Sequence, residues 1–166
     1  MKKKIRRKIK HQEQAERAKF LERVKKHEFA AGREIVENPP DQVKISEVLL
    51  DFAAPLLERF ETEVPVKNII PMAIFAWNLA LTRNEDHNKA INEMAKVLSL
   101  DEKGIEEMNN LMRWLVDRKR NHFAEHKRRI LDYRLSDLGE RYGLQVVSVS
   151  APDDRGSGMV REKESV

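Results

Sequence analysis

One short stretch of the chain carries residues of catalytic type at a usable spacing, namely His122, Glu125 and His126. On a helix, side chains four residues apart lie on the same face, so both imidazoles could reach one metal ion. The glutamate beside them would then serve as a general base that activates a metal-bound water. The spacing therefore predicts a metal-dependent hydrolase as one alternative.

Metal-dependent hydrolysis would need a further protein ligand beside His122 and His126. The order His-x-x-Glu-His is the inverted spacing of one class of zinc protease, and a catalytic zinc site needs a third protein ligand and an open position. The available third ligands are His87, Asp86 and Asp132, and the sequence specifies none of them. Nearby cations also raise the positive potential and oppose a dication: Arg118, Lys119, Arg120, Lys127, Arg128 and Arg129. We therefore expect no catalytic set and no cofactor, and keep His122 and His126 as metal candidates of the alternative.

The helical phase of the same stretch favours a structural role. If one long helix covers it, His126 lies on the face of Phe123, Ile130 and Tyr133. A histidine on an apolar stripe is usually a packed, hydrogen-bonded residue. Glu125 would pair with a cation three or four residues on, at Arg128 or Arg129.

The charge of the chain is distributed unevenly. Residues 1–36 carry 13 basic and 5 acidic side chains, residues 37–110 carry 7 and 14, and residues 111–142 carry 9 and 5. Basic flanks around an acidic middle predict either binding of a polyanion or pairing between flank and middle, within or between subunits.

Two basic segments are the candidates for binding nucleic acid. The first is the arm, with seven cations in ten residues: Lys2, Lys3, Lys4, Arg6, Arg7, Lys8 and Lys10. The second is the run at 118–129, formed by Arg118, Lys119, Arg120, Lys127, Arg128 and Arg129. No helix-turn-helix, zinc-finger, RRM or KH signature accompanies them, so the predicted RNA or DNA binding is non-specific. The alternatives for the arm are binding of an anionic membrane, a nuclear import signal or a solubilising terminus. The alternative for the run is a solvated helix surface.

The remaining sequence predicts an all-α protein, an irregular bundle of about five helices with one long C-terminal helix and a short terminal β-strand. Apolar residues recur at helical steps in the five predicted elements: 20–35, 45–60, 69–81, 88–98 and 102–142. The predicted N-caps are Ser46, Asp86 and Asp101. Trp77 belongs to the element that is apolar nearly all round, so we expect it at the centre of the core.

The predicted organisation is a basic arm at 1–18, helical or flexible, a helical domain at 19–150, and a disordered tail at 151–166. Residues 144–150 are β-branched and uncharged, which predicts a strand. Because a lone strand needs a partner, we expect this segment to pair with a second copy or with another protein, or to pack as an extended segment.

Composition excludes several classes of function. The chain contains no cysteine, so disulfides, iron–sulfur clusters and cysteine nucleophiles are excluded. No secretory signal or transmembrane segment is predicted, and we expect a cytoplasmic protein. The favoured hypothesis is a non-catalytic interaction or regulatory protein, because the sequence predicts a lone strand and a long charged helix and offers no catalytic set. Nucleic-acid binding and metal-dependent hydrolysis are its alternatives.

Overall fold

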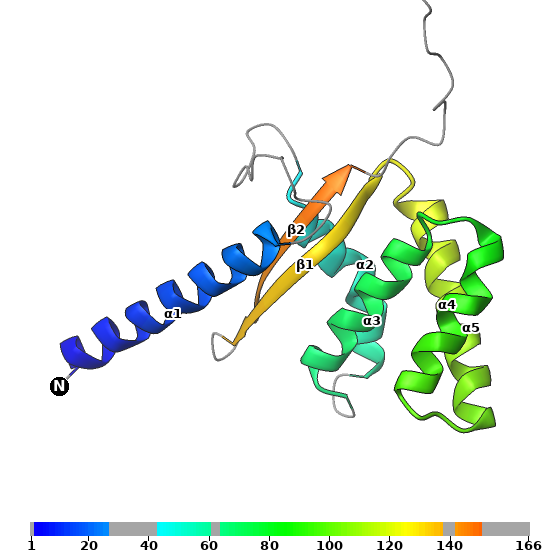
Figure 1. Cartoon of the computed structure of the whole chain (residues 1–166), viewed down its shortest axis with the longest axis horizontal. Coiled ribbons are helices and arrows are strands. Elements are labelled where there is room, and N and C mark those ends of the chain that lie inside the picture. The colour runs from blue at the N-terminus through cyan, green and yellow to red at the C-terminus, as the bar shows by residue number, and fades with distance from the viewer. Residues whose placement is uncertain (1, 27–42, 61–63, 138–141, 151–166) are drawn as a thin grey trace, which may run out of the picture.

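The computed structural model describes residues 2–26, 43–60, 64–137 and 142–150, and Figure 1 shows their arrangement. The helices are α1 (Lys2–Lys25), α2 (Ile45–Arg59), α3 (Val66–Leu79), α4 (Asn84–Val97) and α5 (Glu102–His122). The strands are β1 (Arg128–Asp137) and β2 (Tyr142–Ser150). A two-stranded sheet therefore lies between α1 on one side and the group α2–α5 on the other (Figure 1).

The core forms where the apolar faces of α2, α3 and α5 meet. Phe52, Trp77 and Met112 are fully buried at its centre, and Leu49, Ile70 and Leu115 are buried with them. The Phe52 and Trp77 rings pack edge to face, with centroids 5.4 Å apart, which suits the ring quadrupoles. The predicted central position of Trp77 is thus confirmed.

Helix boundaries follow the sequence closely for α2 and approximately for α3 and α4. The Asp101 carboxylate accepts a hydrogen bond from the Gly104 N–H at 2.8 Å, which confirms it as the N-cap of α5. The other two cap predictions are wrong. Ser46 already lies inside α2, and Asp86 lies in the first turn of α4, where its charge favours the helix dipole.

The prediction of one long helix over 102–142 is wrong. The helix α5 ends at His122, and the chain then turns and forms β1. The molecule is therefore mostly helical with a small antiparallel sheet, and the all-α class is too narrow. The predicted strand at 144–150 is confirmed as part of β2, but it is not alone, because β1 pairs with it.

The β1–β2 pairing has one irregularity. The antiparallel register runs from Arg128 opposite Ser150 to Asp137 opposite Tyr142, and the extra residue Leu131 forms a bulge. Ile130 is buried against the helices, while Tyr133 and Val146 pack beside it. The sheet thus contributes one face to the core.

The side of the sheet away from α2–α5 receives α1. Phe20 and Val24 are buried on this helix, which confirms that its second half docks. The backbone of the arm at residues 2–10 continues the same helix. The docking predicted for Ala31 and Ile35, and the tail at 151–166, lie outside the described residues.

Candidate functional site

The structure separates the residues of the His122, Glu125 and His126 motif. His122 is the last residue of α5, whereas Glu125 and His126 lie in the turn that follows. The two histidines therefore do not occupy one helix face, and the geometric premise of the metal hypothesis is wrong. Within the described ranges, no group of three or more histidine, aspartate or glutamate side chains is arranged to hold a metal ion.

The side chains of Glu125 and His126 contact each other instead of a shared metal ion. Glu125 Oε1 lies 3.1 Å from His126 Nε2. The half-buried His126 ring leans on the Trp77 indole, with centroids 6.4 Å apart. The predicted packing role of His126 is consistent with this position, although the residue lies in a turn rather than on a helical stripe.

The basic run at 118–129 is divided between the interior and the surface. Lys119 is only 2% exposed; its ammonium group donates to the Phe123 carbonyl and lies 4.3 Å from the centre of a Trp77 ring. Arg118 donates to the carbonyls of Phe52 and Asp51, each at 3.2 Å. These two cations hold the end of α5 against α2 and α3, with Lys119 in the interior and Arg118 half-buried.

The other members of the run lie nearer the surface. Arg120 and Lys127 are exposed, and Arg128 and Arg129 are half-buried. This part of the run lies at the end of the sheet farthest from the amino terminus of α1 (Figure 1). The two basic segments that the sequence offered as candidates for binding nucleic acid are therefore not brought together.

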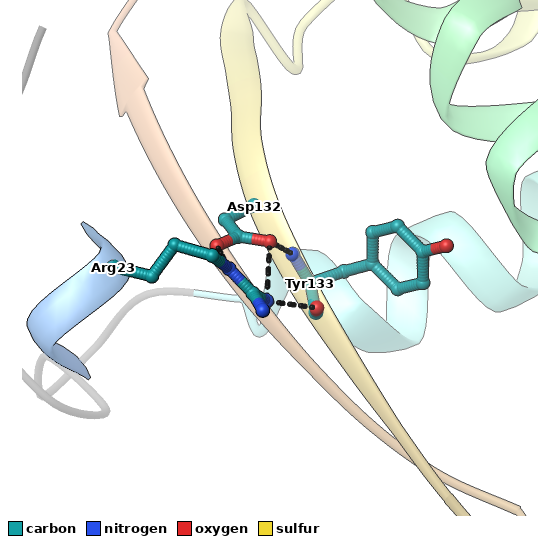
Figure 2. Close-up of polar contacts among 3 residues, drawn as sticks. All are labelled: Arg23, Asp132 and Tyr133. Carbon is teal, nitrogen blue, oxygen red and sulfur yellow. Dashed lines mark hydrogen bonds and ion pairs between the residues drawn. The ribbon is translucent and has the colours of Figure 1, made fainter. Parts of the chain in front are cut away.

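The basic arm occupies the end of an anchored helix. Figure 2 shows the anchor, in which Arg23 donates through Nε and Nη2 to the two carboxylate oxygens of Asp132, the second bond at 2.9 Å. The hydrogen bond to Asp132 raises the pKa of Arg23; burial opposes this rise, and the negative charge of Asp132 adds to it. Arg134 adds an ion pair of 2.8 Å to Glu16.

These anchors fix the direction of α1. Glu16 meets Arg134, and Arg23 meets the earlier residue Asp132, so α1 runs antiparallel to β1. The amino-terminal part of α1 leads past the sheet and projects from the rest of the molecule (Figure 1). Residues 2–15 add about 20 Å of helix beyond the last anchor, at the standard helical rise.

A groove that the sequence did not indicate lies between α2, α3 and α5. It has a volume of about 780 Å³ and is lined mainly by apolar side chains of α2, α3 and α5, including Leu56, Met108 and Leu111. Trp114 lines it with 46% of its surface exposed. Among the described residues, the lining includes no metal-binding or acid–base set, so we assign it no chemistry.

Comparison with known proteins gives no match to a family model, to a curated protein or to a solved structure. None of the described helices is both long enough and apolar enough to cross a membrane.

Proposed function

We propose that this chain is a non-catalytic protein that binds RNA or DNA without sequence preference through the basic arm of α1. The observation that carries the proposal is the projection of the arm, residues 2–10, from a helix whose other half is anchored to the sheet (Figure 1). Seven of these nine residues are lysine or arginine. They lie along about 12 Å of helix, and a DNA duplex carries one phosphate per about 1.7 Å of its axis.

The anchors support this function by keeping the arm helical and directed away from the body. A helix with so many like charges is weak by itself, because cations three or four residues apart repel each other. The contacts of Arg23, Phe20 and Val24 hold the same helix from its other end. Part of the cost of ordering the arm on a polyanion is thus met before binding.

The composition of the arm favours a nucleic acid over a membrane. Ile5 and Ile9 are the apolar residues of the segment 2–10, and they are too few to insert a helix face into lipid. The attraction to phosphate is then electrostatic, so affinity should fall steeply as salt concentration rises.

The test is binding of fluorescent single-stranded RNA and double-stranded DNA, measured by anisotropy over a series of salt concentrations. An arm variant has Lys2, Lys3, Lys4 and Arg6 replaced by Gln, and a matched control has Lys89, Lys96, Lys103 and Arg113 replaced by Gln. The four control residues are exposed on α4 and α5. We expect the arm variant to lose affinity for every sequence and to reduce the salt slope on DNA by up to about 4 units.

Three results would overturn this function. The first is no binding at low salt by the unmodified chain. The second is an equal loss of affinity in the control variant, which would make the effect one of net charge. The third is binding to vesicles of anionic lipid without binding to either nucleic acid.

A second candidate, the interaction protein that the sequence favoured, keeps one specific observation. Its original support, an unpaired strand at 144–150, is removed because β1 pairs with β2. The observation that still supports it is the outer edge of β2. No described residue outside the hairpin forms a backbone hydrogen bond with this edge.

A further inference from the structure

The docked half of α1 fixes which side of the helix each position of the arm occupies. Glu16 and Arg23 form ion pairs with β1, and Phe20 is buried, so these three residues mark the side of α1 that faces the sheet. Since α1 is one continuous helix with 3.6 residues per turn, the positions of Ile5 and Ile9 fall on this same side. The sheet-facing side of α1 therefore continues into the arm as its least charged side.

The cationic positions of the arm are spread around the rest of the helix. Arg6 and Lys10 are one turn apart and form a first flank pair. Lys4 and Lys8 are also one turn apart and form a second flank pair, about 160° around the helix from the first. Cations therefore stand on two nearly opposite flanks of the arm, and not along one stripe.

Two further cationic positions lie between the flank pairs. At the same helical spacing, Lys3 and Arg7 fall on the side of the arm directed away from the sheet. A ligand that matches this pattern needs negative charge along both flanks and hydrogen-bond acceptors between them.

The major groove of duplex DNA has this arrangement of groups. A row of phosphates runs along each side of it, and guanine and adenine present acceptor atoms at its floor. The groove is about 12 Å wide, and an α-helix with its side chains has a diameter of about 10–12 Å. A helix with cations on two flanks can therefore bind the phosphates of both strands at once.

Other nucleic acids match the arm less well. Proteins that bind single strands commonly stack the bases on aromatic side chains, and residues 2–19 contain no phenylalanine, tyrosine or tryptophan. The major groove of duplex RNA is deep and narrow, so an α-helix does not enter it. A single strand also offers only one row of phosphates, which would leave one flank pair without a ligand.

The position of the arm in the molecule leaves both flanks accessible to a duplex. The arm leads past the end of the sheet and away from α2–α5 (Figure 1). The contacts that hold α1 are made from the other half of the helix, by Glu16 and Arg23. Residues 2–10 span about 12 Å of helix, which is the part that the DNA would enclose.

We infer that the arm lies in the major groove of duplex DNA, with one flank pair directed to the phosphates of each strand. Lys3 and Arg7 then face the edges of the bases. This inference rests on the proposed function and restricts it to one class of nucleic acid. Binding remains non-specific in sequence, because most of the attraction comes from the phosphates.

The first test compares the two flank pairs in the full chain. One variant carries Arg6→Gln and Lys10→Gln, and the other carries Lys4→Gln and Lys8→Gln; glutamine keeps a high helix propensity. Anisotropy with duplex DNA over a salt series should show a similar loss of affinity in both variants, and each should reduce the salt slope by about 2 units. A loss confined to one variant would show that the ligand contacts one side of the arm, and would overturn the inference.

The control variant carries Lys89→Gln and Lys96→Gln, which remove two exposed cations from α4. It should bind with the salt slope of the unmodified chain, and an equal reduction in slope would attribute the effect to net charge and overturn the inference. Circular dichroism checks that each variant has the helix content of the unmodified chain.

The second test compares ligands of one sequence and length: duplex DNA, duplex RNA and single-stranded DNA. We expect duplex DNA to bind at least about tenfold more tightly than duplex RNA, because the two have similar charge and differ in the width of the major groove. Bulky uncharged groups on thymine C5, which lies in the major groove, should also weaken binding. Equal binding of DNA and RNA duplexes would overturn this inference and leave the proposed function standing, whereas no binding to any of them would overturn both.

Discussion

Lys119 holds a positive charge in the interior at an electrostatic cost. Burial lowers the pKa of Lys119 from 10.5 to about 8, and the negative charge of Glu125 acts against this shift. The ammonium group is compensated locally by the Phe123 carbonyl and by the face of the Trp77 ring. The end of α5 thus depends on one cation that the surrounding side chains only partly stabilise.

The first prediction concerns the pH dependence that follows from Lys119. Its pKa is lower in the folded than in the unfolded chain, so the folded state binds fewer protons between about pH 8 and 10.5. As the pH rises through that window, Lys119 therefore adds about 1–3 kcal/mol to the free energy of unfolding. Below the window, its contribution to the free energy of unfolding does not change with pH. Urea unfolding at several pH values measures the effect.

Lys119→Met should remove this rise, since an apolar side chain of similar length does not titrate. Lys103→Met is the control, because Lys103 lies on the same helix with 83% of its side chain exposed. The same rise in the Lys119 variant as in the unmodified chain would contradict the assignment.

The second prediction concerns Asn78, whose amide both donates to and accepts from Ile130. Asn78→Leu has nearly the same shape and loses both bonds, so it should lower the free energy of unfolding by about 1–3 kcal/mol. Asn78→Asp keeps the acceptor and loses the donor, and should also destabilise the fold. Asn92→Leu on the exposed side of α4 is the control for urea unfolding, and an equal loss there would argue against a specific role for Asn78.

At the scale of elements, the sequence predicted some helices well, but its prediction that the last helix continues beyond His122 was wrong. The helix at Ile45 to Phe60 could be predicted because apolar residues that form a wide face repeat at helical steps. The observed helix α2 covers almost the same residues. Residues 128–137 are rich in charge, and Ile130 is their only β-branched residue, so local propensity gives little sign of a strand. The strand conformation depends on contacts with Trp77, Asn78 and β2. The spacing of residues within 128–137 does not indicate contacts of this kind.

The candidate site was predictable in part for the same reason. The density of cations at 2–10 is visible in the sequence, whereas their helical projection depends on the contacts that Glu16 and Arg23 make with β1. Conversely, the position of Arg118 and Lys119 within a run of charged residues gave no indication in the sequence that they would be bonded in the interior. Their interior bonds arise because α5 ends against α2 and α3, which spacing alone did not indicate.

The third prediction concerns the docking of α1. Phe20→Ala removes a side chain that is 6% exposed and should weaken the docking by about 3 kcal/mol. Hydrogen exchange should then become faster along α1 and stay unchanged in α5, because the two helices pack in different parts of the molecule. Lys19→Ala, at an exposed neighbouring position, is the control. Faster exchange throughout the molecule would show that α1 does not open independently.

At the scale of the whole molecule, the basic arm and the group α2–α5 lie on opposite sides of the two-stranded sheet (Figure 1). The second half of α1 holds this helix to the sheet through Glu16, Phe20 and Arg23. Substitutions in the arm at residues 2–10 should therefore change binding of nucleic acid without changing the packing of α2–α5.

The bonds of Trp77, Asn78 and Arg23 to β1 also limit how far the protein can polymerise. A strand with two free edges can join copies without end, as amyloid fibrils do. Here the side chains on β1 occupy the positions that a third strand would need. The sheet therefore cannot grow past β1 between Arg128 and Tyr133, so a single asparagine amide on α3 helps to prevent pairing of this edge into an open filament.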